Sequence, residues 1–141
     1  MGSSKLIYLA AVAALASGGC TYEPVTRPEI HGHRGCRGLL PENTLPAFLE
    51  AAEMGCDLLE LDVVITADSQ LLVSHEPWMS HRICRTPEGD SITEQQEHDF
   101  NIYRMTVAEA QSFDCGSTPQ VAFPDQELSP QFKPTLRQVV E

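Results

Sequence analysis

The sequence predicts an α/β fold, because apolar strand patterns and a helical pattern follow one another in the first half of the chain. Residues 30–35 form a short candidate strand, and residues 45–54 repeat apolar side chains at the spacing of an amphipathic helix. Residues 57–65 read DLLELDVVI, a nearly continuous apolar run typical of a strand buried on both faces of a parallel sheet. Residues 71–75 form another apolar run, so the predicted order is strand, helix, strand, strand.

The predicted helix has recognisable ends. Asn43 or Thr44 can cap its first turn, and Pro46 is tolerated there because its missing N–H would have no helical partner. Gly55 is a natural stop, since glycine accepts the backbone conformation that ends many helices.

The second half of the chain is irregular. Residues 76–132 are interrupted by prolines and glycines, and a loop of this length inside a domain is usually functional. A short helix is predicted around 106–113, because Thr106 and Glu109 have capping-box spacing. Residues 135–141 begin another helical pattern.

The N-terminus has the features of an export signal. Residues 1–19 combine the positive Lys5, an apolar run too short to span a bilayer, and small residues before Cys20. This resembles a bacterial lipoprotein cleavage site, although Ser17 occupies the usual position of leucine. We expect an exported protein, periplasmic or anchored in the outer membrane by lipid on Cys20, with 20–29 as a tether. The alternative is a plain secretory signal.

The charge balance limits the classes of partner. The 141 residues have a formal net charge of -11 and a pI near 4.7, which argues against nucleic-acid binding. The same charge offers no long-range attraction to an anionic substrate. Such a substrate would have to be held by a local cation, either a metal ion or a well-placed arginine.

Four cysteines follow Cys20, and an exported protein can pair them. Three complete pairings are possible for Cys36, Cys56, Cys84 and Cys115. We favour a Cys84–Cys115 bridge, because these two flank one irregular stretch. Cys56 lies in an apolar run and is expected to be a buried thiol. The sequence contains no CxxC pair, which would have indicated a zinc site.

Two acidic residues interrupt the most apolar strand. Side chains two apart on a strand point to the same side, so Glu60 and Asp62 would repel one another there. A divalent cation relieves that repulsion, and carboxylate oxygens suit Mg²⁺ or Ca²⁺. The alternative is a strand end whose carboxylates are solvated or paired with arginine.

Two histidines end predicted strands. His33 and His75 could act as general acid and general base on a phosphate ester held between them. Arg34 could hold phosphate oxygens in fork geometry, or it could instead pair with Glu42 or Asp62. The remaining histidines are expected to be structural or exposed: His31, His81 and His98.

These motifs occur together in one ordered stretch. GHRGCRGLLPENTLPAFLEAAEMGCDLLELDVVITADSQLLVSHEP, within residues 30–76, closely resembles the opening of glycerophosphodiester phosphodiesterases. It combines HRG, PENT, ExD followed by a T-x-D turn, and a histidine that ends a strand. The resemblance implies a TIM (β/α)₈ barrel of the phospholipase C-like phosphodiesterase type. It also implies hydrolysis of glycerophosphodiesters to an alcohol and glycerol 3-phosphate.

The resemblance assigns roles to individual positions. His33 and His75 match the acid/base pair, and Arg34 matches the arginine that contacts phosphate. Glu60 and Asp62 match two ligands of one divalent cation, Mg²⁺ or Ca²⁺. A further residue, Glu42, matches a position near the site. The expected partner is a small glycerophosphodiester.

The chain departs from the family pattern in two ways. Glu76 stands where aspartate is common, and a third metal-binding carboxylate and a nearby lysine belong to a later strand that 141 residues do not reach. A closed barrel typically needs ~250 residues, so we expect about the first three strands only. We expect residues 30–141 to be the N-terminal portion of that domain, with a loop insertion at about 76–132. This predicts a truncated and possibly inactive copy.

Two alternatives come from different functional classes. One is a non-catalytic remnant or binding module with the same fold, and the other is a related phosphodiesterase acting on phospholipids. One point of topology also stays open in the sequence. Asp62 and His75 are separated by a helix-free connection, which is either an extended crossover or a hairpin, and the barrel analogy favours the crossover.

Overall fold

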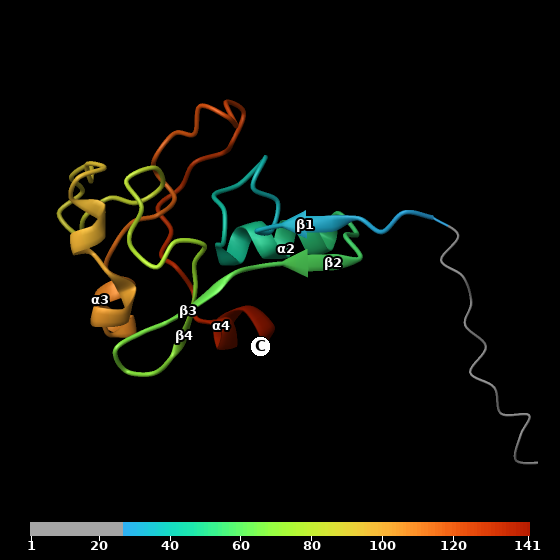
Figure 1. The fold of residues 1–141 in the computed structure, drawn as a ribbon. Coiled ribbons are helices and arrows are strands. Elements are labelled where there is room, and N and C mark those ends of the chain that lie inside the picture. Colours follow the sequence, from blue (N-terminus) through green and yellow to red (C-terminus); the bar gives the residue numbers. More distant parts are fainter. Residues whose placement is uncertain (1–26) are drawn as a thin grey trace, which may run out of the picture.

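The computed structural model describes residues 27–141 (Figure 1). The predicted signal at 1–19, Cys20 and most of the predicted tether at 20–29 lie outside the described residues. In Figure 1, strands β1 and β2 lie beside helix α2 on one side, and the irregular segment with α3 lies on the other. Strands β3 and β4 and helix α4 lie between these two parts. None of the helices within 27–141 is long and apolar enough to cross a membrane.

The first unit is a strand–helix–strand arrangement, as the sequence predicts. Strands β1 (His31–His33) and β2 (Leu58–Glu60) pair in parallel, with Gly32 opposite Leu59 and His33 opposite Glu60. Helix α2 (Leu45–Glu53) connects them. Because the two strands run in the same direction, His33 and Glu60 end side by side at one edge.

Helix α2 is positioned by its N-terminal cap, by a glycine stop and by one close contact with the loop after β1. The Thr44 hydroxyl accepts a hydrogen bond from the N–H of Ala47, which satisfies a free donor of the first turn. Gly55 follows the helix with φ +81°, which confirms its predicted role as a stop. Gly35 has φ +80°, and a Cβ there would lie 2.7 Å from the carbonyl carbon of Ala47. Glycine at 35 therefore lets the loop after β1 touch the helix.

Residues 57–65 do not form one strand. Strand β3 (Val63–Ile65) pairs antiparallel with β4 (Leu71–Val73), so the chain changes partner after Glu60. The Thr66 hydroxyl donates to Asp68 Oδ1 at 2.6 Å, and the Thr66 N–H donates to the Gln70 carbonyl at 2.9 Å. These bonds close a tight hairpin turn. The extended crossover favoured by the barrel analogy is therefore wrong.

The expected burial of these strands on both faces is also wrong for the described residues. Strands β2 and β3 expose Leu58 and Val63 by 50% and 42%, whereas Leu72 of β4 is fully buried. Each sheet has two strands within residues 27–141, so little covers its outer face. Leu72 is covered because Thr135, just before α4 (Leu136–Val140), forms a bridge to it.

The irregular segment is organised by a core of its own. It contains η1 (Glu97–Asp99), η2 (Ile102–Arg104) and α3 (Val107–Ala110), and α3 begins with the predicted Thr106 capping box. Buried apolar side chains from this segment pack in one cluster with Leu72 of β4: Met79, Ile83, Cys84, Ile92, Ile102, Ala110, Phe113 and Cys115. The predicted 76–132 loop is therefore an ordered layer with little regular secondary structure.

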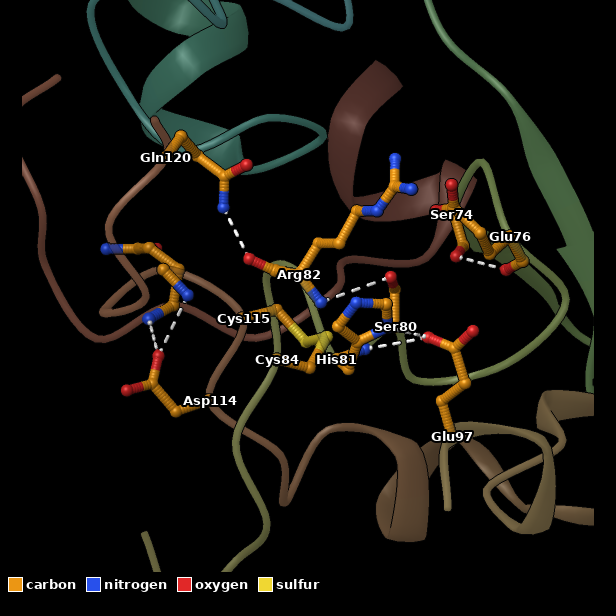
Figure 2. Close-up of a disulfide and its surroundings, with 12 residues drawn as sticks. Ser74, Glu76, Ser80, His81, Arg82, Cys84, Glu97, Asp114, Cys115 and Gln120 are labelled. Carbon is orange, nitrogen blue, oxygen red and sulfur yellow. Dashed lines mark hydrogen bonds and ion pairs between the residues drawn. A yellow bond between two sulfur atoms is a disulfide. The ribbon is translucent and has the colours of Figure 1, made fainter. Parts of the chain in front are cut away.

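A disulfide joins the two ends of this layer (Figure 2). Cys84 and Cys115 are bonded, which confirms the pairing favoured from the sequence. Cys36 and Cys56 are free and partly exposed. The expectation that Cys56 is a buried thiol is wrong, because the turn after α2 places it at the surface.

The histidines assigned to structural roles have neighbours that fit this interpretation. His81 Nδ1 lies 2.6 Å from Glu97 Oε2, a contact drawn in Figure 2. The His98 ring packs edge-on against Trp78, with centroids 4.2 Å apart. His31 lies at the surface, 3.3 Å from Glu29.

Candidate active site

Arg34 lies at the centre of the candidate site. It follows β1 with φ 53°, a left-handed conformation that is uncommon outside glycine and often found at functional sites. Its N–H donates to Glu60 Oε2 at 2.8 Å, and its carbonyl accepts from the Asn43 N–H at 3.0 Å. The backbone of Arg34 thus connects the HRG loop, the PENT loop and the end of β2.

The guanidinium group of Arg34 joins two further carboxylates. Nη1 donates to Glu42 Oε1 at 2.8 Å, and Nε lies 3.8 Å from Asp62 Oδ2. The side chains of Arg34 and Glu42 are only 13% and 10% exposed. A second cation, Arg37, approaches Glu42 at 3.7 Å. Both pairings that the sequence left open for Arg34 therefore occur.

Glu60 and Asp62 both lie against Arg34, one at its backbone N–H and the other at its guanidinium. They flank Leu61 between β2 and β3, with side chains 41% and 35% exposed. Asp62 Oδ2 is buried and accepts no hydrogen bond from residues 27–141. Two hard oxygen donors, one of them without a hydrogen bond, fit part of a Mg²⁺ or Ca²⁺ shell. Within the described part of the chain, no group of three or more His, Cys, Asp or Glu residues is arranged to hold a metal.

His33 lies at the edge of this cluster. Its Nε2 lies 3.8 Å from Glu60 Oε2, its Nδ1 lies 3.5 Å from Arg37 Nη1, and its side chain is 57% exposed. An exposed imidazole next to a carboxylate is accessible to a ligand. The structure therefore brings His33 together with Arg34 and Glu60.

His75 reaches the cluster through the hairpin. The Ser74 N–H donates to the Asp62 carbonyl at 2.9 Å, so His75 follows directly from a residue bonded to Asp62. Its Nδ1 lies 2.9 Å from Glu76 Oε1. Burial acts to raise the pKa of Glu76, but the hydrogen bond and charge of His75 outweigh it, and the pKa is lowered. Among the described residues, His75 makes no ion pair or hydrogen bond with His33 or Glu60.

Buried polar atoms without partners gather in this region. Among the described residues they include Arg34 Nε, Arg37 Nε, both amide atoms of Asn43, and Asp62 Oδ2. Buried polar groups in proteins are nearly always hydrogen-bonded, so unpaired ones call for an explanation. The oxygens of a phosphate ester would supply acceptors for the three nitrogens, and a cation would suit the two oxygens.

Lys133 is a residue that the sequence reasoning missed. It is 2% exposed, and burial lowers its pKa from 10.5 to about 8. The charges of Glu76 and Glu42 oppose that shift, and the charge of Arg34 adds to it, so the ammonium group lies within electrostatic range of the site. One signal was available: Lys133 is the only lysine after Lys5.

Comparison with known sequences now decides the family. The sequence profile of the glycerophosphoryl diester phosphodiesterase family matches residues 33–141, which includes every residue of the site. The chain belongs to this family. It is 31% identical to a Bacillus subtilis glycerophosphodiester phosphodiesterase over 113 residues, and 34% identical to one from Caldanaerobacter subterraneus over 109 residues. Each match covers 77% of this chain and only 34% or 37% of the relative.

Solved structures show that the chain has part of the family's fold. A Silicibacter pomeroyi crystal structure superposes with a TM-score of 0.73 at 34% identity, covering 79% of this chain and 39% of that one. An Oleispira antarctica phosphodiesterase, solved with the product sn-glycerol-3-phosphate, superposes with a TM-score of 0.57 at 26% identity. That match covers 80% of this phosphodiesterase-family chain and 38% of the Oleispira chain. The predicted incomplete barrel is thus confirmed as a partial fold, although its strands form two pairs.

Proposed function

We propose that this protein hydrolyses glycerophosphodiesters to an alcohol and glycerol 3-phosphate with the help of one divalent cation. The observation that carries the proposal is the cluster around Arg34, in which Glu42 and Asp62 face its guanidinium, Glu60 accepts from its backbone N–H, and His33 lies against Glu60. The family match and the Oleispira antarctica complex with sn-glycerol-3-phosphate support the same substrate class.

Glu60 and Asp62 would hold the cation, Mg²⁺ or Ca²⁺. When bound, such an ion offsets the negative charge that develops on phosphoryl oxygens during hydrolysis. Arg34 holds a non-bridging phosphate oxygen, since its Nε donates no hydrogen bond within the described residues. Glu42 fixes the plane of the guanidinium through its 2.8 Å contact with Nη1.

The two histidines divide the proton transfers. One of His33 and His75 removes a proton from the attacking hydroxyl or water, and the other gives a proton to the leaving alcohol. Each ring has a carboxylate beside it: Glu60 lies 3.8 Å from His33, and Glu76 lies 2.9 Å from His75. Each imidazole is about half exposed, so both can exchange protons with water.

The test is release of glycerol 3-phosphate from glycerophosphocholine by the protein as its own gene expresses it. We expect release with Mg²⁺ or Ca²⁺, none with a chelator, and a loss of at least ~100-fold in His33→Ala and His75→Ala. His31→Ala is the matched control, because His31 is exposed on the same strand as His33. Full activity in His33→Ala would refute the assignment.

Other outcomes select the alternatives. Binding of glycerol 3-phosphate without turnover would identify a binding module with the same fold. Equal cleavage of diacylated and deacylated phospholipids would identify a phospholipid-directed enzyme. The absence of both binding and turnover would refute a phosphodiester site altogether.

We also propose export with lipid attachment at Cys20, which rests on the sequence alone. In cells given labelled palmitate, the wild-type protein should carry label and Cys20→Ser should not. Equal labelling of the two proteins would exclude Cys20 as the anchor.

A further inference from the structure

The segment that carries Lys133 is fixed next to the candidate site. The Lys133 carbonyl accepts a hydrogen bond from Gln111 Nε2 at 3.2 Å. The next carbonyl, that of Pro134, accepts from the Val73 N–H of β4 at 2.8 Å. Because β4 leads directly into His75, the backbone at Lys133 runs beside the residues that bring His75 to the site.

The side chain of Lys133 is buried and has no ion-pair partner among the described residues. It is 2% exposed, and within residues 27–141 its ammonium group forms no hydrogen bond and no ion pair within 4.0 Å. Glu42 and Glu76 influence it through space only, and both already pair with other groups, Arg34 and His75. A largely buried cation without an ion-pair partner is unfavourable, so its position beside the candidate site requires an explanation.

We propose that Lys133 is a substrate-binding residue whose ammonium group contacts a phosphoryl oxygen, beside Arg34. The inference rests on the proposed function, since it assigns a second cation to the same phosphodiester. Arg34 offers a fixed, planar fork, whereas a lysine donates from a point charge in any of three directions. The pair can thus hold two oxygens of one phosphate. Because Lys133 is buried, its ammonium group would contact the bound anion and not bulk water.

An alternative role is structural, in which Lys133 only balances the carboxylates of Glu42 and Glu76. The two roles differ in what a neutral replacement changes. A methionine of similar length would alter stability in both cases, because replacing a buried ion by an apolar side chain changes the folded state itself. Only the binding role predicts weaker affinity for a phosphate ester.

The experiment measures binding of sn-glycerol 3-phosphate by calorimetry in buffer with Mg²⁺. Lys133→Met should weaken binding roughly 10- to 100-fold, the range expected for one charge-assisted hydrogen bond. Arg137→Met is the matched control, since it removes one positive charge from an exposed side chain on the adjacent helix. It should change affinity less than ~2-fold. Glycerol, which carries no charge, should bind neither variant.

The outcomes separate this inference from the proposed function. If the wild type binds glycerol 3-phosphate and Lys133→Met binds equally well, Lys133 is a structural counterion and the inference is wrong. If the wild type neither binds nor hydrolyses, the proposed function itself fails. Lysine labelled with ¹³C gives a test without mutation, because the chain has only Lys5 and Lys133. The Lys133 signal should shift with glycerol 3-phosphate and not with glycerol; an unmoved signal would overturn the inference.

Discussion

Loss of the Cys84–Cys115 disulfide should strongly destabilise the protein. The two cysteines are 31 residues apart in the sequence, and the entropy of closing a loop of that length corresponds to about 3.7 kcal/mol at 25 °C. Both side chains lie in the apolar core against β4, at 1% and 2% exposure, so the bridge constrains the elements that build this core. We therefore expect the Cys84→Ala/Cys115→Ala double variant to be less stable by about that amount.

Urea unfolding followed by circular dichroism measures this effect. With an m-value of ~1–3 kcal/mol/M, the midpoint should fall by roughly 1–4 M in the double variant, and by a similar amount when the wild type is reduced. Cys56→Ala is the control, because Cys56 is free and outside this core. An unchanged midpoint in the double variant would show that the core is stable without the bridge, contrary to the reasoning.

Three further predictions concern the site. Gly35→Ala should lower the free energy of unfolding by roughly 2–4 kcal/mol, measured by urea denaturation, because a Cβ at φ +80° would lie 2.7–2.8 Å from backbone atoms of Ala47. Glu42→Gln should lower stability by roughly 1–3 kcal/mol and weaken glycerol 3-phosphate binding, because a nearly buried charge partner of Arg34 is lost. The pKa of Lys133 is lowered from 10.5 to about 8, mainly by burial, so the unfolded chain binds more protons than the folded one between these values. Stability should therefore be lowest below pH 8 and rise toward pH 10.5, by at most ~3 kcal/mol.

Each of these has a matched control. Gly38→Ala should be tolerated, because nothing lies within 4 Å of a Cβ at that position. Glu53→Gln removes an exposed carboxylate at the end of α2 and should leave affinity unchanged. Lys133→Met should abolish the rise in stability between pH 8 and 10.5. If stability still rises between pH 8 and 10.5 in Lys133→Met, titratable groups other than Lys133 cause the rise.

Local signals in the sequence predicted the local structure well. The Thr44 cap, the Gly55 stop and the Thr106 capping box all occur, because each depends on neighbours within a few residues. The sequence offered Asp62 as one partner of Arg34, and the two side chains lie 3.8 Å apart, but it did not predict the bond between Glu60 and the Arg34 N–H. The Cys84–Cys115 pair followed from chain topology alone.

Features that depend on contacts distant in sequence could not be predicted in this way. The apolar run of 57–65 suggested one strand, but its first part pairs with β1 and its last part pairs with β4. The sequence of a strand does not show which other strand it will pair with. Lys133 was missed because its burial depends on the packing of β4 and Gln111 against its backbone. A lysine in an acidic chain resembles a surface residue until those neighbours are in place.

The predicted insertion is also attached to the loop between β1 and α2. The Gln126 side-chain amide donates to the carbonyls of Arg37 and Leu40 at 2.8 and 2.9 Å, and the Glu127 N–H donates to the carbonyl of Leu39 at 2.8 Å. The layer that contains the disulfide therefore supports the loop that begins with the HRG residues. Reduction of the Cys84–Cys115 bond would loosen this layer, and with it the loop that carries Arg34. The oxidation state of a bond outside the candidate site would thus affect how firmly the Arg34 guanidinium is held.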